Sequence, residues 1–109
     1  MHWLDLMSYV FGGAFLANAV PHAVSGMMGR PFQSPFAKPR GQGLSSSTVN
    51  VLWGLFNLAI GYLLVRRVGD FNLKETEDVV ALGLGGLLIS LFMARHFGRF
   101  HGGNAPERP

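Results

Sequence analysis

The sequence predicts an all-α integral membrane protein whose three transmembrane helices pack in a small bundle. Of its 109 residues, 49% are hydrophobic and only 14% are charged, whereas an average soluble domain has roughly 25% charged residues. The apolar residues lie in three runs, 3–28, 49–65 and 79–94, and Asp5 is the only charged residue among them. Each run approaches the roughly 17 to 25 residues that cross a hydrocarbon core. We therefore expect one membrane domain with spans at about 3–29, 48–66 and 78–95. A soluble bundle would need wider polar stripes on its helices.

The first span contains a proline that should shape it. Pro21 has no backbone N–H and obstructs the carbonyl of Ala17, so we expect a kink there. The sequence Ala17-Asn18-Ala19 has the form of a signal-peptide cleavage site, but the residues before it include Asp5 and no lysine or arginine. A secretory signal has a basic start, so a span is the better interpretation.

Residues 30–47 form a proline-rich segment between the first two spans. Prolines at 31, 35 and 39 suppress helix, and such a backbone cannot face lipid inside the hydrocarbon core. We expect the segment at the interface, with its two phenylalanines inserted into the acyl boundary or packed on the bundle and its three basic residues near anionic headgroups. These residues are Phe32 and Phe36, and Arg30, Lys38 and Arg40. A plain solvated connector is the alternative. The prolines are four apart, which does not make a PxxP ligand.

The ends of the later helices carry their own signals. Ser45 to Thr48 offer N-caps for the second span. In the third span we expect the Arg95 side chain to reach back to the interface. The tail 101–109 has nothing apolar to pack, so we expect it to be disordered.

The distribution of basic residues predicts the orientation. With three spans, one side of the membrane carries Arg66, Arg67 and Lys74, and the other carries Arg30, Lys38, Arg40, Arg95, Arg99 and Arg108. The richer side belongs in the cytoplasm. We expect the amino end outside and both the proline-rich loop and the carboxyl end inside.

Each span carries small or polar residues at steps of three or four, which places them on one helix face. Such faces allow close helix packing in lipid. Gly12, Gly13 and Gly85 lie off these stripes, and we assign them to a second interface between protomers. The stripes are Ala14, Asn18, His22, Ser25 and Gly29; Asn50, Gly54, Asn57 and Gly61; and Gly83, Gly86, Ser90 and Ala94.

Polar residues at membrane depth form the candidate site. Counting about 1.5 Å per residue from the helix ends puts His22, Asn57 and Ser90 at one level, roughly 10 Å deep. Together with Asn18 they predict a polar layer in which His22 bonds Asn57 or Ser90. Intramembrane polar groups are paired or functional, so this layer serves either the structure or a substrate.

Enzyme chemistry has little support in the sequence. There is no cysteine, no carboxylate well inside a span, and no spacing among the four histidines that is typical of a metal site. We expect no enzyme activity, no metal and no cofactor. The net charge of +3 reflects topology and does not indicate nucleic-acid binding.

Three functions remain open. The first is a structural or accessory module that forms homo-oligomers or docks on a larger membrane protein through its small-residue faces. The second is a protomer of a small transporter or channel, and the third is a membrane anchor that binds haem through His22. Small multidrug transporters, fluoride channels and haem-anchoring subunits do not match the sequence. The stretch "PHAVSGMMGRPFQSPFAKP" resembles small bacterial inner-membrane proteins. The resemblance implies a location in that membrane but does not point to any activity.

Overall fold

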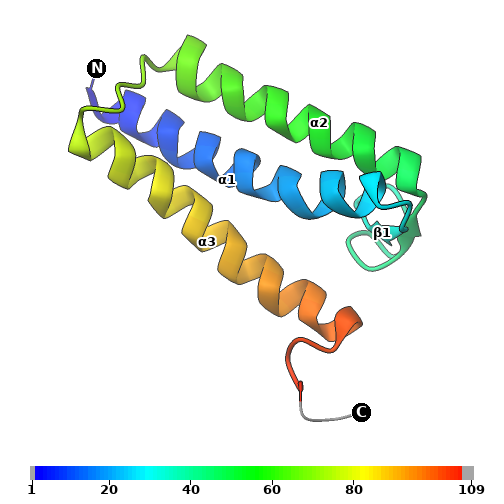
Figure 1. The fold of residues 1–109 in the computed structure, drawn as a ribbon. Helices are drawn as coiled ribbons and strands as arrows, with labels where there is room; N and C mark the ends of the chain where they lie inside the picture. Colours follow the sequence, from blue (N-terminus) through cyan, green and yellow to red (C-terminus); the bar gives the residue numbers. More distant parts are fainter. Residues whose placement is uncertain (1, 107–109) are drawn as a thin grey trace.

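The computed structural model describes residues 2–106 and shows three long helices (Figure 1). They are α1 His2–Met27, α2 Ser47–Leu63 and α3 Thr76–His101, and α2 continues into the π-helix η1 Leu64–Val68. The segments His2–Met27, Ser47–Val68 and Thr76–His101 are each long and apolar enough to cross a membrane. The prediction of an all-helical fold with three helices that are long and apolar enough to span a membrane is confirmed. Pro21 lies inside α1, which continues to Met27, and the kink stays a prediction.

The first helix is the centre of the structure. α1 packs along both α2 and α3, whereas α2 and α3 hardly contact each other. In Figure 1, α3 lies near the start of α1 and diverges from it toward its own carboxyl end. The molecule is therefore two helix pairs that share one helix.

The α1–α2 pair uses the predicted small-residue stripe of α2. The buried residues of α2 are Asn50, Gly54, Asn57 and Gly61 and no others. A Cβ atom added to Gly54 would lie 2.6 Å from the backbone nitrogen of Ala23, so the two backbones touch there. Close approach at small residues is the expected way to pack helices in lipid.

The α1–α3 pair packs mainly through glycines outside the predicted α3 stripe, although Gly86 of that stripe also lies against Gly13. A Cβ atom on Gly85 would lie 1.7 Å from the carbonyl oxygen of Val10, and one on Gly13 would lie 2.1 Å from that of Leu82. Gly12 is also buried, but it packs against Val65 of η1 and not against α3. We predicted that these glycines form an interface between protomers, but they are buried in contacts between elements of the same chain.

The proline-rich loop folds into a small hairpin. β1 Phe32–Gln33 pairs antiparallel with β2 Leu44–Ser45, with Phe32 opposite Ser45. Ser34 and Ser45 share a buried side-chain hydrogen bond, and Gly41 takes a positive φ of 74° at the tip. Ser46 then caps α2 by accepting from the backbone N–H of Val49, as its position in the serine run predicts.

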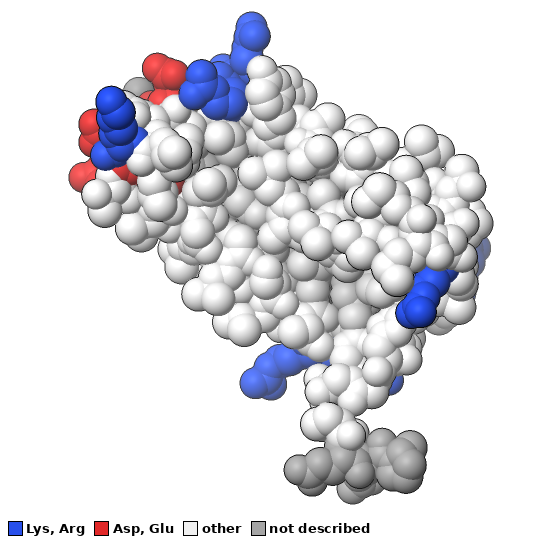
Figure 2. Space-filling view, in the orientation of Figure 1, with Lys and Arg blue, Asp and Glu red and all other residues white. Residues whose placement is uncertain are grey.

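At the end of the molecule away from the hairpin, α1 contacts η1 and the connection that follows it. Ser8 donates its hydroxyl to the carbonyl of Leu64, which also accepts from Gly69 across the π-turn. Tyr9 packs edge-on against Phe71 and fills the space beside Gly69. All acidic residues that the structure describes lie at this end, in the first turns of α1 and α3 and in the connection 69–75 (Figure 2).

The start of the predicted tail belongs to the folded structure. His101 is the last residue of α3, and Gly102 ends the helix with a φ of 80°. The Asn104 side chain then donates to the carbonyl of Arg95. Residues 107–109 of the predicted disordered tail lie outside the described residues.

Candidate functional site

A buried asparagine joins the hairpin to the helices. Asn50, in the first turn of α2, is fully buried. Its Nδ2 amide donates to the carbonyl oxygens of Phe32, Ser45 and Ser46 at 3.0–3.2 Å. Because an amide nitrogen carries only two hydrogens, two of these three contacts share one. Asn50 thereby satisfies backbone groups of both hairpin strands.

The oxygen of the same amide determines which ring nitrogen of His22 carries the proton. Asn50 Oδ1 can only accept, and it lies 2.8 Å from His22 Nδ1. His22 therefore donates through Nδ1–H, and in the neutral ring Nε2 keeps its lone pair. The ring is 2% exposed and is surrounded edge-on by Phe32, Trp53 and Phe97, at centroid distances of 5.4 to 6.3 Å.

A second polar contact between α1 and α2 lies farther from the hairpin. Asn18 Nδ2 donates to Asn57 Oδ1 at 3.0 Å, and Asn57 Nδ2 donates to the carbonyl of Trp53 at 2.8 Å. His22 bonds Asn50, and not Asn57 or Ser90 as the depth count predicts. The predicted layer is thus two separate pairs between α1 and α2.

Ser90 lies apart from both pairs, across a groove between α1 and α3. The groove has a volume of about 400 Å³, with Ala17, Val20 and Pro21 on one wall and Ser90, Met93 and Ala94 on the other. Phe32 and Phe97 also line it. Ser90 is exposed and has no hydrogen bond to the other three predicted residues.

The residues predicted to contact lipid divide into two groups. Phe32 is buried and packs against His22, Phe97 and His101, so it faces the bundle. Phe36 is 62% exposed and lies edge-on to Trp53 on the outer face of α2. The Nε1 atom of Trp53 is buried and has no hydrogen-bond partner among residues 2–106. Arg30, Lys38 and Arg40 are all exposed.

Two histidines that were not predicted as site residues attach α3 to the hairpin. His96 Nε2 donates to the carbonyl of Gly41 at 2.6 Å, and His101 Nε2 donates to Gln33 Oε1 at 2.8 Å. The His101 ring also stacks on Phe32, with centroids 5.1 Å apart. The signal that could have found them is their position on consecutive turns at the polar end of the third span.

The buried cluster at this end is built for hydrogen bonding. The carbonyls of Phe32 and Ser45, the Asn50 amide and His22 Nδ1 satisfy one another, and aromatic rings close the space around His22. Within residues 2–106 no three histidine, aspartate or glutamate side chains lie close enough together to hold a metal ion.

A comparison of this chain with protein-family models, with curated proteins and with solved structures finds no match.

Proposed function

We propose that the protein is a small multi-pass membrane module with a structural or accessory role. It associates, with a second copy or with a larger membrane protein, through the small-residue face of α3. The observation that carries the proposal is the contrast between the two stripes. The α2 stripe is wholly buried inside the chain, whereas Gly83, Ser90 and Ala94 of the α3 stripe are exposed.

The surroundings of these residues support helix docking. A Cβ atom on Gly83 would meet nothing within 4 Å, and Ser90 and Ala94 form one wall of the groove beside α1. Exposed small residues allow a second backbone to approach closely in lipid. Pro21 gives the opposite wall a carbonyl, that of Ala17, which lacks the usual intrahelical donor. Ser90 and this carbonyl could each bond a polar group on a neighbouring helix.

Single-cysteine crosslinking in membranes tests the proposal, because the chain has no cysteine of its own. We expect Gly83→Cys and Ser90→Cys to form a disulfide-linked dimer if a second copy docks there. The matched controls are Leu84→Cys and Leu91→Cys, which are exposed at nearly the same depth on another face of α3. Docking on a larger protein would instead protect Gly83→Cys and Ser90→Cys from a maleimide in native membranes, and purification would remove that protection. Equal crosslinking and equal labelling at all four positions would refute the proposal.

A protomer of a small transporter or channel is the second candidate. It is favoured by a pocket of about 210 Å³ in which Asn18 and Asn57 meet Ala14 and Phe15 of α1 and Ile89 of α3. If the protein is such a protomer, we expect Asn18→Leu to abolish solute or ion flux in liposomes while the protein stays folded. Flux that is unchanged by this variant would exclude the pocket as a path.

A haem anchor through His22 is less well supported. The ring nitrogen available for an iron, Nε2, lies within the enclosure of Phe32, Phe97 and Trp53. His22 would have to leave that enclosure to bind haem. A Soret band in the visible spectrum of the purified protein would show that it binds haem and would support this function.

For the orientation we propose a bacterial inner membrane with the amino end outside and the carboxyl end inside. The support is the distribution of basic residues: Arg30, Lys38, Arg40, Arg95 and Arg99 lie at the hairpin end, and Arg66, Arg67 and Lys74 lie at the other. A reporter fused after Arg108 should read cytoplasmic, and one inserted in residues 70–76 should read external. The reverse pattern would invert the orientation.

A further inference from the structure

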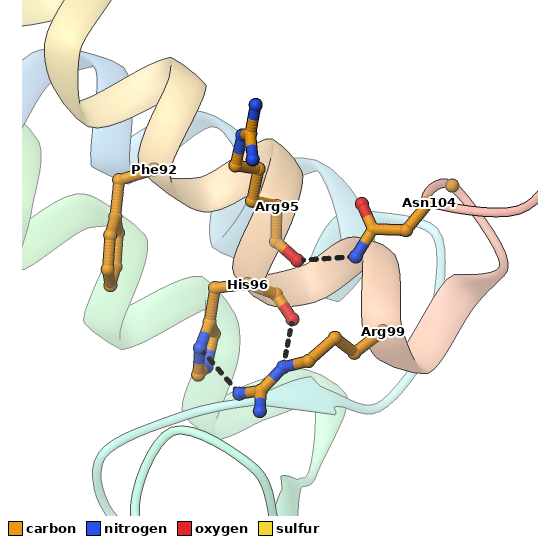
Figure 3. A pocket seen from close by; sticks show the side chains of 6 residues that line it. Phe92, Arg95, His96, Arg99 and Asn104 are labelled. Carbon is orange, nitrogen blue, oxygen red and sulfur yellow. Dashed lines mark hydrogen bonds between the residues drawn. The ribbon is translucent and has the colours of Figure 1, made fainter.

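The outer face of the last turns of α3 holds a pocket that neither the polar pairs nor the groove includes. It has a volume of about 830 Å³ and is lined by Phe92, Arg95, His96, Arg99, Gly103 and Asn104 (Figure 3). The turn after α3 forms part of its wall, because the Asn104 amide holds that turn against the Arg95 carbonyl. No acidic residue among residues 2–106 lies at this end of the molecule.

One guanidinium of the pocket is held in a fixed position. The carbonyl oxygen of Gly41 can only accept, so His96 Nε2 carries the proton that it donates to that oxygen. The other ring nitrogen, Nδ1, accepts from Arg99 Nη2 at 2.9 Å, and Arg99 Nε donates to the His96 carbonyl at 3.3 Å. The Arg99 guanidinium also lies 5.2 Å from the centre of the Phe100 ring.

This arrangement leaves part of Arg99 free for a ligand. Of the five N–H donors that a guanidinium carries, one on Nε and one on Nη2 are in use. The other donors have no partner in the described structure. A fixed guanidinium with unused donors is well suited to bind a phosphate oxygen, since the ordering of the side chain is already complete.

Arg95, one turn earlier, is the second cation of the pocket. Its guanidinium makes no salt bridge among the described residues and points away from Arg99 in Figure 3. Arg95 is exposed, and the preceding turns of the same helix expose Leu88, Leu91 and Phe92. In a bilayer this places a charged group directly beside a lipid-facing apolar surface, where it must find an anion or water.

We propose that this pocket binds the phosphate group of an anionic phospholipid. Arg99 is the fixed contact, and Arg95 turns in to complete it. The acyl chains lie along Leu88, Leu91 and Phe92. His96 is a positioning residue, because it holds Arg99 and does not itself touch the lipid. The site is separate from the proposed helix-docking face and does not depend on it.

Native mass spectrometry of the full chain in detergent tests the site, with added phosphatidylglycerol or phosphatidylcholine. We expect a preference for phosphatidylglycerol that falls on the order of tenfold in Arg99→Gln and in Arg95→Gln, as the loss of a charged hydrogen bond implies. The matched controls are Arg67→Gln and Lys74→Gln, which remove the same charge from exposed positions at the opposite end of the molecule. An equal loss in all four variants would show nonspecific attraction and overturn the proposal, as would no loss in the α3 variants.

Two further measurements identify the ligand and the role of His96. Inorganic phosphate should compete only weakly, and competition as strong as that of the lipid would make the ligand a free phosphate instead. His96→Phe keeps a ring beside Phe92 and removes both hydrogen bonds. It should weaken phosphatidylglycerol binding in the wild-type background but have no further effect in Arg99→Gln. Additive effects of the two substitutions would mean that His96 does not act through Arg99.

Discussion

α2 and α3 carry small residues at the same helical spacing and use them differently. Every member of the α2 stripe is buried against α1, whereas α3 packs on α1 through Ala81, Gly85 and Met93 and leaves Gly83 open. The difference is that α2 has asparagines in its stripe, and these have hydrogen-bond partners in α1. A stripe of small residues permits packing, and the polar residues within it determine which face packs.

The largest expected effect comes from adding a methyl group to each kind of α3 glycine. Gly85→Ala would place a Cβ atom 1.7 Å from the Val10 carbonyl oxygen, so α1 and α3 must separate. We expect the free energy of unfolding in detergent to fall by about 2 kcal/mol or more. Gly83→Ala meets nothing and should gain up to about 1 kcal/mol from helix propensity. If both substitutions destabilise the protein equally, α3 does not pack through Gly85.

The next test removes the main polar contact of α2. Asn50→Ala leaves the carbonyls of Phe32 and Ser45 and the His22 ring without their partner, at a cost of about 1 to 3 kcal/mol. The hairpin should loosen, so trypsin should cleave after Arg40 faster than in the wild type. Val49→Ala, at an exposed neighbouring position, is the control. A cleavage rate that does not change would mean that Asn50 does not hold the hairpin.

A smaller effect is expected at the histidine that Asn50 contacts. His22→Gln retains an N–H that can reach Asn50 Oδ1, whereas His22→Leu leaves this buried oxygen unpaired. We expect His22→Leu to be the less stable of the two by about 1 kcal/mol, measured by thermal unfolding in detergent. Equal stability would show that the ring contributes only its packing.

The smallest effect is expected at the hydrogen bond between Asn18 and Asn57. Asn18 is only partly buried, and its one side-chain hydrogen bond within residues 2–106 is to Asn57. Asn18→Ala should lower the free energy of unfolding by about 0.6 kcal/mol, the average for such bonds in membranes. A loss as large as that of Asn50→Ala would mean that the two polar pairs form one coupled network.

The sequence predicts the helices and the face of α2 well because their signals are local. Apolar runs give the spans, and α2 has a single set of small and polar residues that could pack. In α3 the glycines at 83, 85 and 86 belong to two faces, and nothing local decides between Gly83 and Gly85. The deciding contact is with Val10, far away in the chain.

The partner of His22 could not be predicted for a similar reason. Counting depth treats each helix as an independent rod and brings Asn57 level with His22. The structure folds the hairpin back over the start of α2, and its carbonyls at Phe32 and Ser45 hold the Asn50 amide close to His22. The prolines in the loop signal an irregular backbone, but they do not say which residue will satisfy it.

The central position of α1 also bears on how the protein is made. A chain leaves the ribosome from its amino end, so the helix that contacts both others precedes the other two into the membrane. Once residue 68 has emerged, α1, the hairpin and α2 have nearly all of the contacts that they share, including those of Asn50 and Asn57. α3 then arrives at a preformed pair and adds its Gly85 contact and its two histidine bonds to the hairpin. Biogenesis should therefore pass through a stable two-helix intermediate, and a chain that ends before Thr76 should still insert and protect its hairpin.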